Sequence, residues 1–396
     1  MVINKAYKFR LYPNKSQKEF LAKQFGCVRF VWNYFLDLRK TDYTENKRSR
    51  SYHQDAKDLT KLKKENEFLK EVNSQALQYS LRNLDTAYDR FFRKIAKFPN
   101  FKKKNYKNSF HIPQHFNIYE DKIYIPKIKD GIKFKQHRQI NGIIKSITIS
   151  KTATNKYYVS ILVEEDHQPL QSNNNSIGID LGIKKFSIFS DGRKIDNPKL
   201  LRKNRIKLTY NQRQLSKKTK GSNARNKYRL RVATIHEKIK NQRLDFLHKL
   251  TFNIVRENQV ICAESLKVSN LMKNHKLAQA IGEVSWYEFF RQLDYKSRWN
   301  SRQFVQIEWF FPSSKMCSNC GHINQNLKLS NREWICDNCQ SELDRDFNAS
   351  INILNQGIKI LSGCASQSDI KQKEWEQSVC NPDAMNTQAT ASGGGS

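Results

Sequence analysis

The sequence predicts a multidomain α+β protein, because the spacing of its apolar residues changes along the chain and a polar segment divides it. Apolar residues recur at helical spacing from residue 16 to about residue 98, and a two-residue alternation replaces this pattern from residue 110 to about residue 165. The 396 residues amount to two or three domains of ordinary size. The polar stretch 167–175 separates two patterned regions, and we expect a domain boundary there.

The strong positive charge of the chain indicates a polyanionic partner. Lys and Arg number 71 against 37 Asp and Glu, which gives a formal net charge of +34. Such self-repulsion is of no use to an enzyme of small metabolites, whereas nucleic acid would neutralise it. No apolar run approaches the roughly 18 residues of a membrane-spanning helix, and residues 1–5 lack the apolar core of an export signal. We therefore expect a cytoplasmic protein that binds nucleic acid.

The first 166 residues are expected to form a β unit interrupted by helices. Residues 1–15 have the pattern of a strand that ends at a turn, and Ser16 with Glu19 matches a capping box that begins a helix. Mostly helical, charged sequence continues to about residue 98, where Pro99 stops it, and short strands separated by Asp, Gly and Asn turns follow from Phe110 to about Glu165. We expect the strand in residues 1–15 to complete this β unit.

Residues 90–110 interleave Lys and Arg with aromatic side chains. Basic groups bind phosphates and aromatic rings stack on bases, so this composition suits nucleic acid. A charged run is more often only a solvated face, but the charge of the whole chain favours phosphate contact here.

A second mixed unit is expected in residues 176–362. Apolar strands are expected at 177–181, 186–189, 260–263 and 304–309. Between them, the basic segment 199–249 is helical in pattern, with one apolar stripe formed by Val232, Ile235, Ile239, Phe246, Leu250 and Ile254. We interpret the stripe as core packing, with Lys and Arg on the opposite face. Residues 363–396 lose all periodicity, are predicted to be disordered, and end in a Gly-Ser run typical of a linker scar.

Three acids lie where a metal-dependent hydrolase would hold them. Asp180 stands in an apolar strand between two glycines, where an unpaired buried charge is strongly unfavourable. Glu264 lies where an apolar strand ends, and Asp346 opens an amphipathic helix, a position that Asp344 could share. Converging carboxylates can hold two Mg²⁺ or Mn²⁺ ions about 4 Å apart, one activating water and the other stabilising the leaving oxygen of a phosphodiester. Alone, Asp346 could be a helix N-cap and Glu264 an exposed charge.

Four of the eight cysteines are spaced as zinc ligands. Two Cys-x₂-Cys pairs separated by fifteen residues fit the four-thiolate pattern: Cys317, Cys320, Cys336 and Cys339. Four thiolates leave no open position on the metal, so this Zn²⁺ would be structural. Gly321 can supply a tight turn, and Trp334 can cover the site. Cys27 and Cys262 lack ligand spacing and are expected to be small core residues.

Specific motifs surround these acids and cysteines. They are Ile177-Gly-Ile-Asp-Leu-Gly, Glu264-Ser-Leu, Pro312-Ser-Ser-Lys-x-Cys-Ser-x-Cys-Gly and Asp344-Arg-Asp-x-Asn-Ala-Ser-x-Asn-Ile. Together with the opening Tyr7-Lys-Phe-Arg-Leu-Tyr-Pro, they resemble the transposon-encoded TnpB (OrfB-type) family, which is related to the type V CRISPR effector nucleases. The resemblance covers roughly residues 1–360. Ala349-Ser350 stands where that family has Ala-Ala, a departure that leaves the acids in place.

The resemblance implies a domain organisation. A wedge β-barrel would comprise residues 1–15 and 109–166, split by a helical recognition domain at 16–108. After the linker 167–175, a RuvC-like nuclease of the RNase H fold would comprise residues 176–311 and 341–362. A zinc ribbon at 312–340 would interrupt that nuclease.

The resemblance also implies an activity. Such proteins are RNA-guided DNA endonucleases that take a noncoding RNA from the transposon end as guide and a short adjacent DNA motif as a mark of the double-stranded target. Their catalytic acids would be Asp180, Glu264 and Asp346, and Asp346 is favoured over Asp344 by its Asp-x-Asn-Ala motif. The protein would then work at the nucleoid of a prokaryote. The alternatives are a nucleic-acid-binding regulator with an inactive nuclease domain, which the presence of all three acids disfavours, and a transposase.

Overall fold

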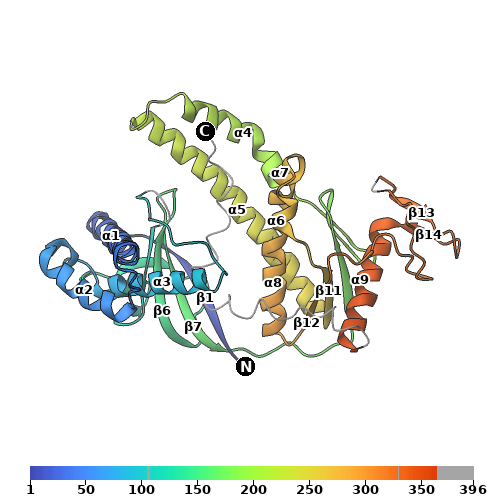
Figure 1. Ribbon diagram of the computed structural model, residues 1–396, viewed down its shortest axis with the longest axis horizontal. Coiled ribbons are helices and arrows are strands. Elements are labelled where there is room, and N and C mark those ends of the chain that lie inside the picture. The colour runs from blue at the N-terminus through green and yellow to red at the C-terminus, as the bar shows by residue number, and fades with distance from the viewer. Residues whose placement is uncertain (105–107, 329, 364–396) are drawn as a thin grey trace. The chain divides into compact units, whose positions relative to one another are not determined.

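The computed structural model describes residues 1–104, 108–328 and 330–363 (Figure 1). They form two compact units, one at Val2–Asp166 and one that comprises Met1 and the residues from His167 onward. Both units combine helices with a sheet, which confirms the α+β class. The segment 364–396, for which the sequence predicts disorder, lies outside the described residues.

The unit Val2–Asp166 is built on an antiparallel sheet in the order β2-β6-β7-β1-β5-β4-β3. Its strands are β1 (Val2–Leu11), β2 (Asn108–Ile112), β3 (Asn117–Tyr119), β4 (Lys122–Tyr124), β5 (Ile132–Lys135), β6 (Ile143–Lys151) and β7 (Tyr157–Asp166). β1 pairs with β7 along its whole length, from Val2 opposite Asp166 to Leu11 opposite Tyr157. The N-terminal strand therefore lies inside the sheet, beside the strand that ends this unit.

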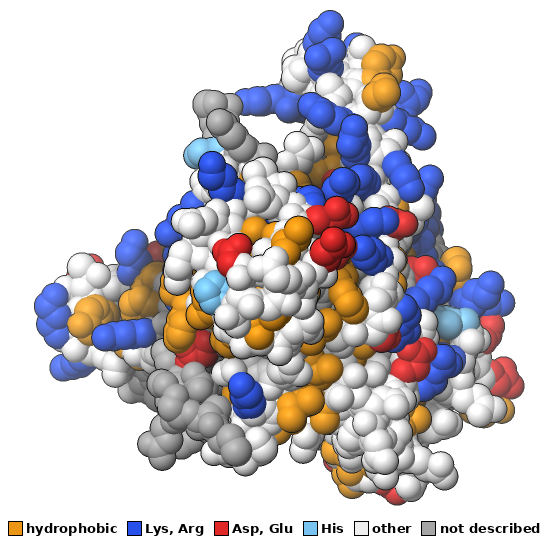
Figure 2. All heavy atoms as spheres, turned by 90° about the vertical axis from the view of Figure 1, so that its right-hand side faces the viewer, with side chains coloured by type: hydrophobic (Ala, Val, Ile, Leu, Met, Phe, Trp, Pro, Cys, Tyr) orange, Lys and Arg blue, Asp and Glu red, His pale blue; other side chains and the backbone are white. Residues whose placement is uncertain are grey.

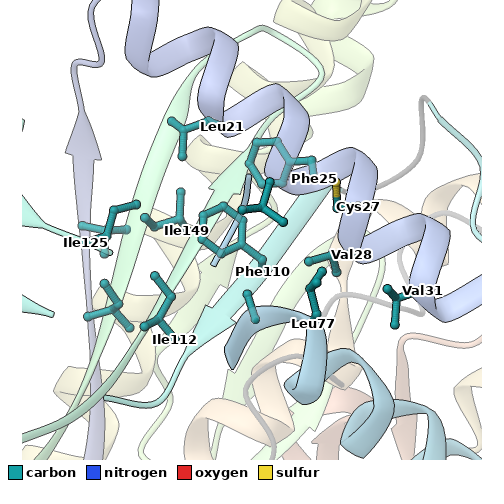
Figure 3. Close-up of a cluster of buried hydrophobic side chains, with 14 of the residues drawn as sticks. Leu21, Phe25, Cys27, Val28, Val31, Leu77, Phe110, Ile112, Ile125 and Ile149 are labelled. Atoms are coloured by element: carbon teal, nitrogen blue, oxygen red, sulfur yellow. The ribbon is translucent and has the colours of Figure 1, made fainter. Parts of the chain in front are cut away.

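Helices complete this unit: α1 (Lys15–Asn46), α2 (Tyr52–Glu65), the 3₁₀ turn η1 (Glu67–Leu69) and α3 (Ser74–Phe92). Phe25 and Val28 of α1 and Leu77 of α3 belong to one apolar core with Phe110 and Ile149 of the sheet (Figure 3). Cys27 is buried in the same core, as its lack of ligand spacing predicts.

The capping box of α1 is not the pair that the sequence predicts. Asn14, in extended conformation, is the N-cap, and its side chain accepts a hydrogen bond from the backbone amide of Gln17, whose side chain accepts one from the amide of Asn14. Ser16 instead donates its hydroxyl to Asn14 Oδ1. Asn is as good an N-cap as Ser, so the reciprocal pair forms two residues earlier.

The second unit contains a mixed sheet in the order β10-β9-β8-β11-β12. Its strands are β8 (Ser176–Leu181), β9 (Lys185–Phe189), β10 (Lys194–Asp196), β11 (Val260–Glu264) and β12 (Gln303–Ile307). β8, β11 and β12 are parallel neighbours, whereas β9 and β10 are antiparallel. The carboxyl ends of β8, β11 and β12 consequently meet at one edge of the sheet.

The helices of the second unit are α4 (Leu200–Ser216), α5 (Asn223–Glu257), α6 (Val268–Leu271), α7 (His275–Val284), α8 (Trp286–Trp299) and α9 (Arg345–Leu361), and a hairpin of β13 (Glu333–Ile335) and β14 (Glu342–Asp344) precedes α9. The basic segment forms two helices, which are separated by a turn at Gly221. The φ of Gly221 is +89°, in the left-handed region that glycine adopts readily. Its apolar stripe serves two cores: Ile235 and Ile239 pack on Leu208 of α4, and Ile254 packs on the sheet side. No helix among the described residues is long and apolar enough to cross a membrane.

Candidate active site and metal centre

Helix α9 lies directly against β8 and β11 because glycines allow a close approach. A Cβ atom on Gly178 of β8 would lie 2.0 Å from the carbonyl oxygen of Ser350, and one on Gly357 of α9 would lie 2.2 Å from Sγ of Cys262. Any side chain at either glycine would overlap the facing element. Cys262 is fully buried under this contact, so the sequence expectation of a small core residue is confirmed.

The contact fixes which way the strand acids face. Side chains two residues apart on a strand share a face, so Asp180 lies on the face of Gly178 and Glu264 on the face of Cys262. Gly178 is the register partner of Cys262 in the parallel β8–β11 pair. Asp180 and Glu264 therefore project from neighbouring strand ends toward the side that α9 covers.

Asp346 reaches the same side from the helix. It precedes Ser350 by four residues, and Ser350 is the residue over Gly178, so both lie on the face of α9 that meets the sheet. Asp180, Glu264 and Asp346 are each partly buried. Two strand ends and the first turn of a helix thus bring together three acids that are far apart in the sequence.

The acids influence one another electrostatically. The pKa of Asp180 is raised to about 8, chiefly by burial and then by repulsion from Glu264 and Asp346. Burial also raises the pKa of Glu264, although a hydrogen bond from the hydroxyl of Ser313 opposes the shift. Carboxylates that destabilise each other's charge are stabilised by a cation between them.

Asp344 and Asp346 have different roles in the structure. Asp344 is the N-cap of α9, where its side chain accepts from the backbone amides of Asp346 and Phe347, and it also pairs with Lys194. The alternative that Asp346 is the N-cap is therefore wrong. The carboxylate of Asp346 is left for other partners.

Those partners are guanidinium groups. Arg332 donates to Oδ2 of Asp346 at 2.8 Å, and Arg345 donates to Oδ1 at 3.0 and 2.8 Å. The three acids are spaced more loosely than a closed metal cage: among the described residues, the one group of ligand atoms that all lie within 4.8 Å of one another consists of cysteines. The hard carboxylate oxygens suit Mg²⁺ or Mn²⁺, and a metal at this site would compete with both arginines for Asp346.

The four cysteines predicted as ligands do meet. Sγ of Cys317 lies 3.6 Å from that of Cys339, and Sγ of Cys320 lies 3.6 Å from that of Cys336. A tetrahedron with metal–sulfur bonds of about 2.3 Å has edges of about 3.8 Å, whereas a disulfide would bring the sulfurs to about 2.05 Å. The cluster has the size of a four-thiolate metal site.

Tight turns and an apolar cover hold this cluster. Gly321, at φ +76°, donates its amide to the carbonyl of Cys317, and the amide of Cys336 donates to the carbonyl of Ser341. Trp334 is buried against Cys317 and Cys336, as the sequence predicts for a residue that covers the site.

Sequence reasoning missed three residues that connect the cluster to the acids. Asn352 of α9 donates to the carbonyls of Ser313 and Met316, and Asn348 donates to Met316 as well. Ser313 in turn donates to Glu264. The segment that carries the cysteines is thereby fixed both to α9 and to β11. All three residues lie within the quoted motifs, which was the available signal.

Basic side chains lie along the helix pair α4–α5, in the upper part of Figure 2. Arg229 and Lys240 are exposed there. Arg225 differs, because its guanidinium donates to the carbonyls of Leu215 and Lys218 at the end of α4. Arg225 stabilises the turn between the helices, so the expectation that the Lys and Arg opposite the stripe form a solvated face does not hold for this residue.

A basic chain with converging acids and a four-thiol cluster belongs to the class of proteins that act on nucleic acids. Family models match three parts of it. A model described as a probable transposase (OrfB type) matches residues 159–275, one described as a helix-turn-helix domain matches residues 1–48, and one described as a Cas12f1-like TNB domain matches residues 286–353.

Relatives that align over most of this chain identify its family. A protein of Streptomyces pristinaespiralis that carries the name RNA-guided DNA endonuclease is 39% identical over 362 residues, which cover 90% of each chain. A protein of Escherichia coli (strain K12), InsQ, which also carries the name RNA-guided DNA endonuclease, is 32% identical over 377 residues, covering 90% of this chain and 93% of InsQ. The chain belongs to the TnpB (OrfB-type) family. A solved structure titled as a Cas12f1-sgRNA-target DNA complex aligns with a TM-score of 0.36 and 14% identity, over 89% of this chain and 99% of that one.

Proposed function

We propose that this protein is an RNA-guided, Mg²⁺-dependent DNA endonuclease in which Asp180, Glu264 and Asp346 hold the catalytic metal. The observation that carries the proposal is the convergence of these acids, since burial together with the charges of Glu264 and Asp346 raises the pKa of Asp180. A buried acid whose pKa is strongly raised by neighbouring charges is typical of catalytic sites. The names of the full-length relatives support DNA as substrate and RNA as guide.

The proposed domains follow the resemblance. Residues 176–311 and 341–362 would be a RuvC-like nuclease of the RNase H fold, to which the mixed five-stranded sheet and α9 would belong. Residues 312–340 would be a zinc ribbon inserted into it. In the other unit, residues 1–15 and 109–166 would be the wedge domain and 16–108 the recognition domain.

The residues around the acids divide the work. When bound, Mg²⁺ would activate water and neutralise charge on the phosphodiester. Asp180 is fixed by its strand, and Ser313 orients Glu264. Arg332 and Arg345 hold Asp346 in place, and a bound metal would compete with them for its oxygens. Their charges then remain beside the site, where a phosphate group would bind.

The cysteine cluster would hold one structural Zn²⁺. Its four thiolates would fill a tetrahedral coordination shell and leave no position for substrate. Because Asn348 and Asn352 tie this segment to α9, the ion would stabilise the surroundings of Asp346 rather than take part in the reaction.

The partners in this proposal are a transposon-end noncoding RNA as guide and a double-stranded DNA target marked by a short adjacent motif. The net charge of +34 provides the electrostatic attraction for both nucleic acids. The place of action would be the nucleoid in the cytoplasm of a prokaryote.

One experiment tests this function. The full chain is purified with its copurifying RNA, the RNA is sequenced, and DNA that matches its guide segment is supplied with Mg²⁺. The wild type should cut this DNA, Asp180→Ala should bind it without cutting, and Asp245→Ala, which removes an exposed acid on α5, should cut normally. Binding of RNA and DNA without cutting by the wild type would instead identify a regulator with an inactive nuclease domain.

A further inference from the structure

Two large aromatic side chains stand exposed directly after strand β12. Trp309 is 61% exposed and its neighbour Phe310 is 63% exposed. The next residue, Phe311, packs instead beside the small core of Cys262, Ile307 and Ile353. Most of the apolar surface of these two rings is left in contact with solvent. Adjacent exposed aromatic rings mark a binding surface more often than scattered single ones do.

The loop 308–312 that carries them is held beside Glu264 at both ends. Before the loop, Ile307 is the register partner of Glu264, and the carbonyl of Ile307 accepts a hydrogen bond from the amide of Ser265 at 3.0 Å. After the loop, Ser313 donates its hydroxyl to the carboxylate of Glu264. The exposed rings are therefore the tip of a short loop that begins and ends at one of the three acids.

The surroundings of Trp309 suit a nucleobase. The ammonium group of Lys267 lies 4.3 Å from the centroid of the Trp309 ring, and the Phe310 ring stands at 83° to it with centroids 6.0 Å apart. A flat ring stacks on any base, and a neighbouring cation can hold the adjoining phosphate. An apolar protein partner would gain nothing from Lys267.

We propose that Trp309, supported by Phe310 and Lys267, is a stacking site for a base of the single DNA strand that passes the acids. The inference rests on the proposed function and adds a substrate-binding site to it. The charge of the protein indicates what binds this site. A chain of net charge +34, with aromatic and basic side chains beside three acids, attracts an unpaired nucleic-acid strand more strongly than a protein. Stacking would fix the strand next to the bond to be cut without reading its sequence.

The test separates base stacking from phosphate contact. The full chain with its copurified RNA carries Asp180→Ala, so that DNA is not cut. Its affinity is measured by fluorescence anisotropy for two single DNA strands of about 12 nucleotides, a length within the usual range of site sizes. One strand has thymine bases throughout and the other has abasic sugars with the same phosphates. Raised salt weakens the phosphate contacts that the strands share.

Trp309→Ala should weaken binding of the thymine strand by about 5- to 150-fold, the loss expected for one stacked base. It should leave the abasic strand unchanged, and Trp309→Phe should restore most of the affinity. The matched control is Phe252→Ala, since Phe252 is 56% exposed and also has a cation near its ring, the guanidinium of Arg256 at 5.8 Å. That variant should bind both strands normally.

Equal losses for the thymine and abasic strands would overturn the proposal, because a structural defect or a lost charge would explain them. Unchanged binding of the thymine strand, or an effect confined to a matched RNA strand, would overturn it as well. The readout does not depend on cutting. If the wild type failed to cut DNA, the proposed function would fail, but these affinities would still decide the stacking site. If Trp309→Ala left binding unchanged, the stacking site would fail, but cleavage would still decide the proposed function.

Discussion

The side chain of Asp344 accepts a hydrogen bond from the backbone amide of Asp346, with 3.1 Å between Oδ1 and the nitrogen. One acid thus caps helix α9 while the other extends from its first turn. A sequence of Asp-Arg-Asp offers both residues for either role, and the helix start separates them. The pair can therefore be tested as two variants with opposite effects.

Asp344→Ala should lower stability by about 1 kcal/mol, the usual loss for an N-cap, and retain most DNA cleavage. Asp346→Ala should change stability little, because its carboxylate is partly exposed, and should lower cleavage at least about a hundredfold, since even indirect partners of a metal cost 10- to 100-fold. Denaturant unfolding and a cleavage assay measure the two effects. Loss of cleavage in a well-folded Asp344→Ala protein would contradict the assignment.

Gly357→Ala should destabilise the second unit by about 1–3 kcal/mol, because its new methyl group would overlap Cys262. Displacing α9 would also move Asp346 and reduce cleavage. Gly26→Ala is the matched control in a helix interior: its nearest neighbour would be Arg29 at 4.0 Å, so the change should stabilise α1 by about 0.5–1 kcal/mol. Thermal melting of both variants measures these changes in stability. A stabilised Gly357→Ala protein would show that α9 does not lie this close to Cys262.

Metal analysis of the purified protein should find about one zinc ion per chain. Cys336→Ser should lose it and increase hydrogen exchange in residues 312–340, because metal binding supplies much of the folding free energy of so small a segment. Cys27→Ala, which changes a buried cysteine outside the cluster, should keep the zinc. A wild-type protein without zinc is the result that would rule out this centre.

Arg229→Gln with Lys240→Gln should weaken nucleic-acid binding without unfolding the protein. Both side chains are exposed, and such changes usually alter stability by less than about 0.5 kcal/mol. If each contacts a phosphate, the slope of log affinity against log salt should fall by about 1.8 on duplex DNA. Arg225→Gln serves as the contrast, because it should lower the melting temperature by releasing the carbonyls of Leu215 and Lys218. An unchanged salt slope would mean that this face is merely solvated.

The sequence by itself determined the features that depend on local spacing. Two Cys-x₂-Cys pairs can meet around one metal because each pair forms its own turn, and the sulfurs do meet. The spacing of apolar residues likewise placed Asp180 and Glu264 on strands and Asp346 at the start of a helix. The motifs around these acids predicted the family. The roles of the three acids remain a prediction, which the cleavage assays address.

The tertiary structure alone decided how these elements meet. Helical spacing shows one stripe on α5, but whether Ile239 or Ile254 packs on α4 or on the sheet depends on where Gly221 turns the chain. Asn14 and Ser16 are equally good caps by type, and only the entry of the chain into α1 selected Asn14. Gly357 contacts Cys262 across about 95 residues of sequence, as Ser313 reaches Glu264. Such contacts follow from packing between distant segments, and no local pattern encodes which distant segment will be the partner.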